Sequence, residues 1–244
     1  MLSNNQIKLI KSLSQKKYRQ ELGLFTVEGI KGVNEFLNSN YKLHKLYTTG
    51  LSFGVAAALE FEVTDKELKK ISTLKNPNTV LAIFEMPKQT NFSADGLVVA
   101  LDDVRDPGNL GTIIRLCDWY GVTDLVCSKA TVDCYNSKVV QATMGSLTRV
   151  NIIYLDLYSF VDDFKGTVYG TFMEGDSIYT AKLPKNGLLI LGNEANGISS
   201  GLEKKITNRL TIPQFGNASK TESLNVANAT AIVLSEFRRR IIEM

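Results

Sequence analysis

The sequence has one histidine, His44, and only three cysteines among its 244 residues. A single histidine argues against a Ser-His-Asp triad and against a metal site built from several histidines. Cys117, Cys127 and Cys134 show no CxxC spacing and have no histidine nearby, which argues against a zinc site and a disulfide framework. We therefore expect no bound metal, give His44 no role in a site, and expect all three cysteines to be small buried hydrophobic residues.

Long apolar runs are also missing. No segment approaches the roughly 18 to 20 apolar residues of a membrane helix, and residues 1–20 lack the apolar stretch of a signal peptide. We therefore expect a cytoplasmic protein that does not cross a membrane.

Two common nucleotide-binding motifs are absent as well. The segment LVVALDDV (residues 97–104) is followed by DPGNLGTIIR (residues 106–115), a strand that stops at Pro and Gly and reopens as a helix. That turn lacks the GxGxxG of dinucleotide-binding proteins, and no P-loop string occurs in the chain. The absence argues against a dehydrogenase or another dinucleotide-binding enzyme.

The residues that are present predict an α/β protein in two domains. Apolar residues make up 44% of the chain, which is ample for a buried core. Pro, Asn, Ser and Gly break every periodicity in residues 86–96, so we place the boundary there. We expect a small α/β domain over residues 1–90 and a larger α/β domain over residues 91–244.

In the first domain the residue pattern alternates between helix and strand. We expect helices at residues 4–14, 29–39, 53–60 and 65–72, and strands at residues 24–29, 42–49 and 78–87.

In the second domain apolar runs alternate with helical patterns, which favours a mostly parallel sheet covered on both faces. We expect strands at residues 97–103, 123–128, 149–155, 166–172, 188–192 and 209–213. We expect helices at residues 109–121, 137–147, 157–164, 199–206 and 224–242.

Positive charge is concentrated near the N-terminus. Residues 1–90 hold 13 Lys and Arg against 8 Asp and Glu, whereas the remainder holds 15 against 17. Lys16, Lys17 and Arg19 stand close to Tyr18, a mixture of cations and one ring that suits a nucleic-acid backbone. A solvated helix face is the alternative interpretation of this run.

Three loops at strand ends are rich in Asn, Gly and Ser, and ligands of open α/β sheets bind at such ends. In the first loop, Asn109 and Arg115 are six residues apart, nearly two helical turns, so both can point the same way if the helix begins near Asn109. The second loop, LLILGNEANGISS (residues 188–200), contains Glu194. The third contains Ser223 and Asn225 before the last helix. Asn109, Ser223 and Asn225 could each merely cap a helix.

Together the three segments DPGNLGTIIR, LLILGNEANGIS and IPQFGNASKTESLNVANATAIVLSEFRR resemble the three ordered motifs of the SpoU (TrmH) family of RNA ribose 2′-O-methyltransferases, in the SPOUT superfamily. The resemblance covers residues 96–240. Residues around VEGIKGVNEFL resemble the small substrate-binding domain, similar to an RNA-binding ribosomal protein, that many members carry.

The resemblance implies an α/β-knot domain in which the C-terminal segment passes through a loop to make a deep trefoil knot, a topology that general rules would have rejected. It also implies that S-adenosylmethionine is the methyl donor and that the protein is a homodimer whose interface includes the last helix. By motif position the cofactor-binding residues would be Thr171, Gly192, Ile212 and Leu224.

The same resemblance places Asn109, Arg115, Glu194, Ser223 and Asn225 around the acceptor nucleotide. Methyl transfer to a ribose hydroxyl needs an aligned acceptor and removal of its proton. Because a guanidinium keeps its proton in proteins, we expect Arg115 to clamp a phosphate and polarise the 2′-hydroxyl. For Glu194, substrate contact and orientation of its own loop are equally open.

The predicted function is methylation of a ribose 2′-hydroxyl in structured RNA, rRNA or tRNA, with Lys16, Lys17 and Arg19 supplying RNA affinity. The alternative is a non-catalytic RNA-binding module that retains the knot fold.

Overall fold

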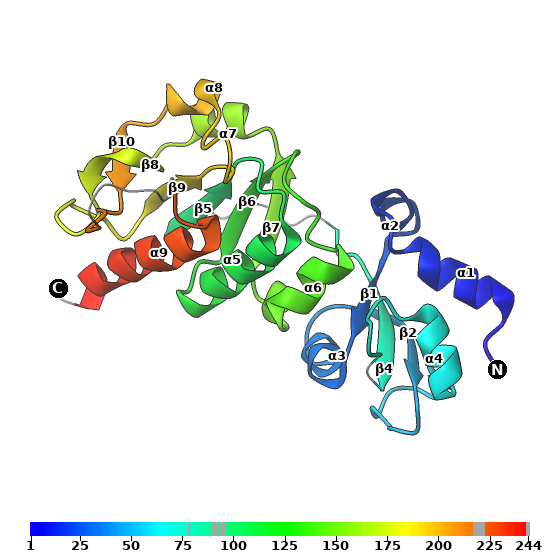
Figure 1. Cartoon of the computed structure of the whole chain (residues 1–244). Coiled ribbons are helices and arrows are strands. Elements are labelled where there is room, and N and C mark those ends of the chain that lie inside the picture. Colours follow the sequence, from blue (N-terminus) through cyan, green and yellow to red (C-terminus); the bar gives the residue numbers. More distant parts are fainter. Residues whose placement is uncertain (78, 89–91, 93–95, 217–222, 243–244) are drawn as a thin grey trace. The chain divides into compact units, whose positions relative to one another are not determined.

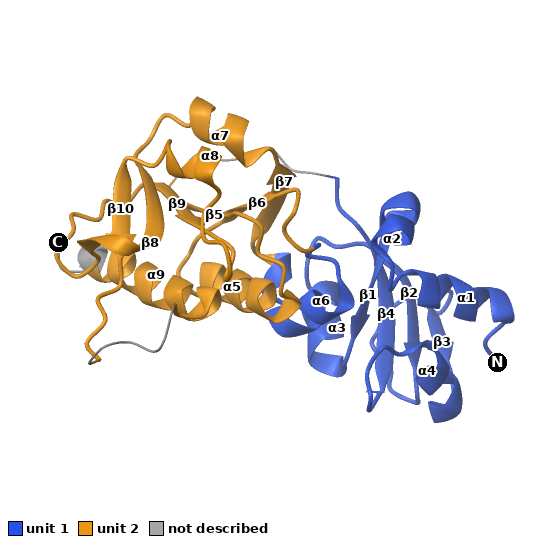
Figure 2. Cartoon of the chain, turned by 45° about the horizontal axis from the view of Figure 1, so that its top comes forward, with its two compact units in different colours: residues 1–89, 133–148 blue, residues 90–132, 149–244 orange. Residues whose placement is uncertain are grey.

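The computed structural model describes residues 1–77, 79–88, 92, 96–216 and 223–242. The chain divides into two compact units (Figure 2). Unit 1 consists of residues 1–89 and 133–148, and unit 2 of residues 90–132 and 149–244. The sequence-based division at residue 90 does not anticipate that residues 133–148, which lie far beyond it, belong to unit 1.

Unit 1 contains a four-stranded sheet in the order β1-β4-β2-β3 (Figure 2). β4 pairs antiparallel with β1 and with β2, whereas β2 and β3 are parallel. The strands are β1 (Leu24–Glu28), β2 (Leu43–Thr48), β3 (Glu60–Glu62) and β4 (Val80–Glu85). The helices are α1 (Asn4–Ser12), α2 (Lys16–Leu22), α3 (Ile30–Leu37), α4 (Asp65–Ile71) and α6 (Ser137–Thr143).

Capping boxes fix the starts of α1 and α4. Ser3 accepts a hydrogen bond from the Gln6 backbone and Thr64 accepts one from the Glu67 backbone, while each Gln or Glu side chain returns a bond. These two helices cover a core that includes Ile10, Leu68 and Leu81.

A separate aromatic cluster brings the inserted segment into unit 1. The ring centroids of Phe25 and Tyr135 are 4.7 Å apart, and Phe25 also packs against Phe36 and Tyr41. Burial raises the pKa of Tyr41 to about 12 and also raises that of Tyr135. Residues 133–148 are therefore part of the unit 1 core.

Unit 2 contains a six-stranded parallel sheet in the order β10-β8-β9-β5-β6-β7. Its strands are β5 (Leu97–Leu101), β6 (Asp124–Ser128), β7 (Asn151–Leu155), β8 (Val168–Ser177), β9 (Gly187–Leu191) and β10 (Asn208–Thr211). The central strands β5 and β9 are buried along their whole length, as continuous apolar runs predict.

Helices cover both faces of this sheet (Figure 1). α5 (Pro107–Trp119) and α9 (Val226–Ile242) pack together on one face, and α7 (Leu157–Asp163) and α8 (Ser200–Glu203) lie on the other. A short 3-10 helix, Ser146–Thr148, follows α6 within unit 1. Cys117, Cys127 and Cys134 are buried, which confirms their expected role as small core residues.

One predicted helix is wrong. Residues 53–59 form a loop and a turn, residue 60 begins β3, and Gly54 has φ +68°, a left-handed conformation outside a right-handed helix. None of the described helices is long and apolar enough to cross a membrane.

Candidate functional site

The three polar segments follow the carboxyl ends of β5, β9 and β10, three parallel strands of the unit 2 sheet. We call residues 102–106, after β5, the first-motif loop, and residues 192–199, after β9, the second-motif loop. β5 and β9 are parallel neighbours whose last residues, Leu101 and Leu191, are paired, so the two loops leave the sheet side by side. The third-motif segment, residues 212–225, includes residues 217–222, which lie outside the described part of the chain.

A pocket of about 650 Å³ is lined by the second-motif loop, by residues of β8 and by residues around the third-motif segment, and ligand pockets span roughly 300 to 1,000 Å³. Its lining includes all four residues expected to hold the cofactor, Thr171, Gly192, Ile212 and Leu224. Glu194 and Ser223 also line it, whereas Asn109, Arg115 and Asn225 do not.

Gly192 allows the chain to close one side of the pocket. A Cβ atom at this position would lie 2.2 Å from the carbonyl carbon of Gly197 and 2.3 Å from the backbone nitrogen of Ile198. No side chain fits there, because real Cβ atoms do not approach backbone atoms so closely.

The second-motif loop is closed on itself. Asn193 and Gly197 exchange backbone hydrogen bonds of 3.0 and 2.8 Å, and the Asn193 Oδ1 accepts bonds from the backbone nitrogens of Ala195 and Asn196. Glu194 therefore sits on a small, internally bonded loop at the pocket.

Three of the predicted site residues are joined by side-chain hydrogen bonds. The Asn109 Nδ2 donates to the Glu194 Oε1 at 2.6 Å, and the Asn225 Nδ2 donates to the Asn109 Oδ1 at 3.0 Å. One residue from each motif thus takes part in a single chain of contacts, although the three are separated by 85 and 116 residues in sequence.

The structure shows which of Asn109 and Asn225 caps a helix. α5 is capped by Asp106, whose Oδ1 accepts a bond from the Asn109 backbone nitrogen at 2.8 Å, so Asn109 is not the cap. Asn225 does cap α9, because its Oδ1 accepts bonds from the backbone nitrogens of Ala227 and Asn228. Its Nδ2 donates to Asn109 at the same time, so Asn225 both caps α9 and contacts another predicted site residue.

The expectation that Asn109 and Arg115 point the same way is wrong. α5 begins at Pro107, so both residues are already helical and six helical positions turn by about 600°, which is 120° short of two full turns. Arg115 is exposed and lies on a different side of α5 from the Asn109 side chain.

Arg19, which the sequence predicts to bind RNA, is not exposed. It is buried within unit 1, where its Nη2 lies 2.5 Å from the Asp133 Oδ2 and its Nη1 donates to the carbonyl oxygens of Leu13 and Ser14. A guanidinium with these partners does not face a phosphate. Lys16 and Lys17, in the same helix, are exposed.

The sequence interpretation missed the contribution of β8. Phe172, Met173 and Glu174 line the pocket, and the Arg209 guanidinium lies 3.5 Å from the centroid of the Phe172 ring. β8 extends through Ser177 and its register against β10 shifts between Arg209 and Leu210. The polar residues that follow Thr171 in the sequence were the available signal of this irregular extension.

Comparison with known proteins agrees with this geometry. A model of the SpoU rRNA Methylase family matches residues 96–235, more than half of the chain. The chain belongs to the SpoU rRNA methylase family. Residues 4–82 match the MRM3-like substrate binding domain.

Among curated relatives of this SpoU-family chain, the 23S rRNA (guanosine(2553)-2′-O)-methyltransferase RlmP of Bacillus subtilis is 30% identical over 96% of this chain and 96% of its own length. A 23S rRNA (uridine(2479)-2′-O)-methyltransferase of Streptomyces viridochromogenes is 33% identical over 68% of this chain and 62% of its own length.

Solved structures match the chain over nearly its full length. A TrmH-family protein from Porphyromonas gingivalis has a TM-score of 0.90 and 40% identity, covering 98% of this chain and 99% of its own. An rRNA methyltransferase from Sinorhizobium meliloti, with AdoMet bound, has a TM-score of 0.86 and 33% identity, covering 99% and 97%.

Proposed function

We propose that this SpoU-family chain transfers a methyl group from S-adenosylmethionine to a ribose 2′-hydroxyl of structured RNA, with ribosomal RNA as the substrate class. The observation that supports it most directly is the chain of contacts from Asn225 through Asn109 to Glu194, at the edge of a pocket large enough for the cofactor. The names of the full-length relatives support the RNA class.

The pocket suits S-adenosylmethionine in size and in the close backbone approach at Gly192. Gly192, Ile212 and Leu224 would hold the cofactor largely through backbone groups, with Thr171 beside them. When bound, S-adenosylmethionine supplies a methyl group carried on a sulfonium. The trefoil knot that the resemblance implies belongs to this proposal.

On the acceptor side, the Glu194 carboxylate would accept a hydrogen bond from the ribose hydroxyl and align it, because it is held by Asn109 and lines the pocket. Asn225 fixes the Asn109 amide in turn. Ser223, which is exposed at the pocket, would contact the nucleotide, and Arg115 would clamp the adjacent phosphate.

We also propose a homodimer through unit 2 in which Arg115 serves the site of the partner copy. Gly108, Thr112, Arg115 and Trp119 form an exposed stripe along α5, and the Trp119 side chain is 84% exposed. α9 packs beside α5, so the last helix adjoins this face. A second copy on the stripe would cover the exposed tryptophan, and its Arg115 would supply the guanidinium that the contact chain of Asn225, Asn109 and Glu194 lacks. The proposal includes a cytoplasmic location, which the cysteine pattern of the sequence supports.

In unit 1 we propose that exposed lysines of α2, Lys16 and Lys17, bind the RNA backbone. Replacing both with alanine should weaken RNA binding and flatten its dependence on salt, while the affinity for S-adenosylmethionine stays the same. RNA affinity equal to that of the wild type would remove this part of the proposal.

The proposed reaction is tested by incubating the purified chain with S-adenosylmethionine labelled in the methyl group and total RNA, followed by digestion to nucleosides. Label in 2′-O-methylnucleosides is expected. Cofactor binding in calorimetry with no transfer to any RNA would favour the non-catalytic module instead, and label in a base would refute ribose specificity.

A further inference from the structure

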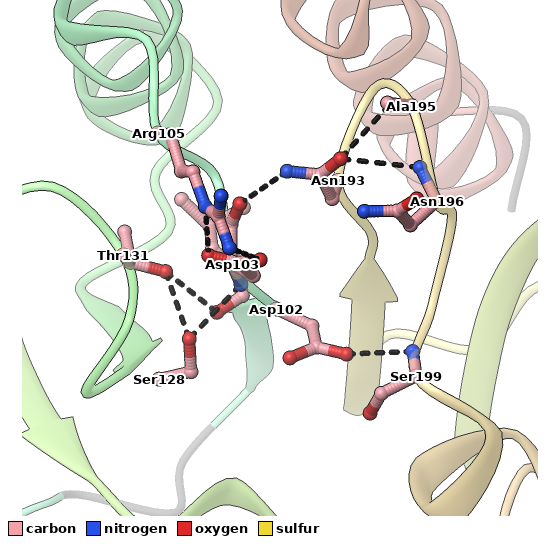
Figure 3. Close-up of polar contacts among 10 residues, drawn as sticks. Asp102, Asp103, Arg105, Ser128, Thr131, Asn193, Ala195, Asn196 and Ser199 are labelled. Carbon is pink, nitrogen blue, oxygen red and sulfur yellow. Dashed lines mark hydrogen bonds and ion pairs between the residues drawn. The ribbon is translucent and has the colours of Figure 1, made fainter.

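Two hydrogen bonds tie the second-motif loop to the first-motif loop (Figure 3). At the entry of the second-motif loop, the Asn193 Nδ2 donates to the carbonyl oxygen of Asp103 at 2.7 Å. At its exit, the Ser199 backbone nitrogen donates to the Oδ2 of the buried Asp102 at 2.8 Å. The loop that carries Glu194 is thus held at both ends by residues that directly follow β5.

The Asn193 side chain uses both of its ends. Its Oδ1 accepts bonds from the backbone nitrogens of Ala195 and Asn196, which shape the second-motif loop, while its Nδ2 reaches the other loop. Aspartate has nearly the same shape as asparagine, but it could not replace Asn193 here. An ionised aspartate accepts hydrogen bonds and cannot donate one, whereas asparagine does both. The residue type is therefore matched to a link between two loops.

The anchor of this link is held rigidly. Asp103 has φ +60°, a left-handed conformation that aspartate tolerates better than most residues. Its carboxylate receives two bonds of 2.7 Å from Arg105, and its backbone nitrogen donates to the Ser128 Oγ at 2.9 Å. These contacts fix the direction of the Asp103 carbonyl toward Asn193.

The second-motif loop also contacts α5, the helix that follows the first-motif loop. Asn109 lies in the first turn of α5, shortly after Asp103, and Glu194 directly follows Asn193. The bond between Asn109 and Glu194 and the bond between Asn193 and Asp103 therefore close one ring of contacts. Loss of the bond between Asn193 and Asp103 would leave the Glu194 carboxylate held to α5 by its bond with Asn109, with one fewer contact between the two loops to keep it there.

We propose that Asn193 is a positioning residue for methyl transfer, which holds the Glu194 carboxylate against Asn109 by anchoring the second-motif loop on the Asp103 carbonyl. The inference rests on the proposed function, since Glu194 is the group that aligns the acceptor hydroxyl.

The test is Asn193→Asp, which keeps an oxygen for Ala195 and Asn196 but turns a second oxygen toward the Asp103 carbonyl. The rate of methyl transfer in a single turnover, at saturating S-adenosylmethionine and RNA, should fall about tenfold or more, because small misplacements of reacting groups are costly. The affinity for S-adenosylmethionine, measured by calorimetry, should change less than about threefold, a small free-energy difference. Asn186→Asp, the same change at an exposed position ahead of β9, is the matched control and should leave both quantities unchanged.

Coupling to Asn109 separates positioning from general loss of structure. In an Asn109→Ala background, Asn193→Asp should slow transfer by a much smaller factor than in the wild type, since its target contact is already gone. Equal factors in both backgrounds, or a loss of cofactor affinity that matches the loss of rate, would overturn the proposal.

If Asn193→Asp fails to fold, Arg105→Met replaces it. The Arg105 side chain is 71% exposed, so this change should be tolerated, and it removes only the ion pair that holds Asp103. It should lower the same rate constant without weakening cofactor binding, and an unchanged rate would contradict the inference. A wild-type chain that transfers no methyl group to RNA would instead refute the proposed function.

Discussion

Single backbone contacts determine the shape of the proposed cofactor pocket, and Gly192 is the clearest case. Gly192→Ala should lower the affinity for S-adenosylmethionine by about fivefold to a hundredfold, because a clash of this kind costs roughly 1 to 3 kcal/mol. Calorimetry measures this directly. Gly216→Ala is the control, since a Cβ there meets nothing within 4 Å. Equal affinity in Gly192→Ala and wild type would show that the loop does not shape the cofactor site.

Arg19 belongs to the stability of unit 1. Arg19→Met should destabilise the protein by about 3 to 5 kcal/mol, since it leaves the Asp133 carboxylate without its buried partner. The double change Arg19→Met and Asp133→Leu should be less costly than Arg19→Met alone, and Lys17→Met should be nearly neutral. Urea denaturation ranks the three variants. A destabilisation of Arg19→Met no larger than that of Lys17→Met would contradict the structural role.

The site residues and Arg19 show which features of this protein can be predicted from the sequence and which cannot. Asn109, Glu194 and Asn225 could be selected because the polar loops at strand ends that contain them resemble, in order, the three motifs of the SpoU family. The burial of Arg19 could not be foreseen, because its partner is 114 residues away and each residue alone looks like a solvated charge. The expected orientation of Arg115 relied on a spacing of nearly two turns, but six helical positions leave Asn109 and Arg115 about 120° apart around α5.

At the scale of elements, the cap of α4 combines Thr64 and Glu67. Thr64→Ala should cost about 1 kcal/mol of stability, as the loss of an N-cap hydroxyl usually does. Urea denaturation of the variant beside the wild type measures this cost, and equal stability would show that the cap is dispensable.

The Glu67 carboxylate gives this cap a dependence on pH. Hydrogen bonds from the backbone nitrogens of Thr64 and Leu2 lower the pKa of Glu67 to about 2. Because the folded pKa is depressed, the stabilisation is present above the ordinary carboxyl pKa and is lost as the pH falls toward 2. The stability gap between wild type and Glu67→Gln should therefore close between about pH 5 and pH 2. A gap that stays constant over this range would show that the charge of Glu67 does not support the cap.

Strands in unit 2 were predictable because a buried parallel strand is a continuous apolar run between polar loops, as in β5 and β9. The loop at residues 53–59 was not, since its alanine-rich run satisfies a helical pattern while Gly54 breaks the conformation. α2 and β3 are short elements whose residues gave no separate signal. Local pattern thus sufficed where burial is uniform and failed where a turn interrupts it.

At the scale of the molecule, the proposed dimer makes a prediction about two slowed variants. Arg115→Ala and Asn109→Ala copies should each transfer methyl groups far more slowly than the wild type, whereas mixed and refolded together they should recover part of the lost rate, because one site of the heterodimer then holds both residues. Methyl transfer to RNA, with each variant refolded alone as the control, measures it. No recovery in a mixture shown to contain heterodimers would place Arg115 and Asn109 in the same copy.

The central claim, methylation of a ribose 2′-hydroxyl in RNA, is tested most directly by mapping 2′-O-methyl sites in total RNA from cells with and without this gene. At least one site, in ribosomal RNA, should disappear without the gene, return with the wild-type gene and return to a much lower extent with Asn109→Ala. An identical set of 2′-O-methyl sites in both cell lines would contradict it.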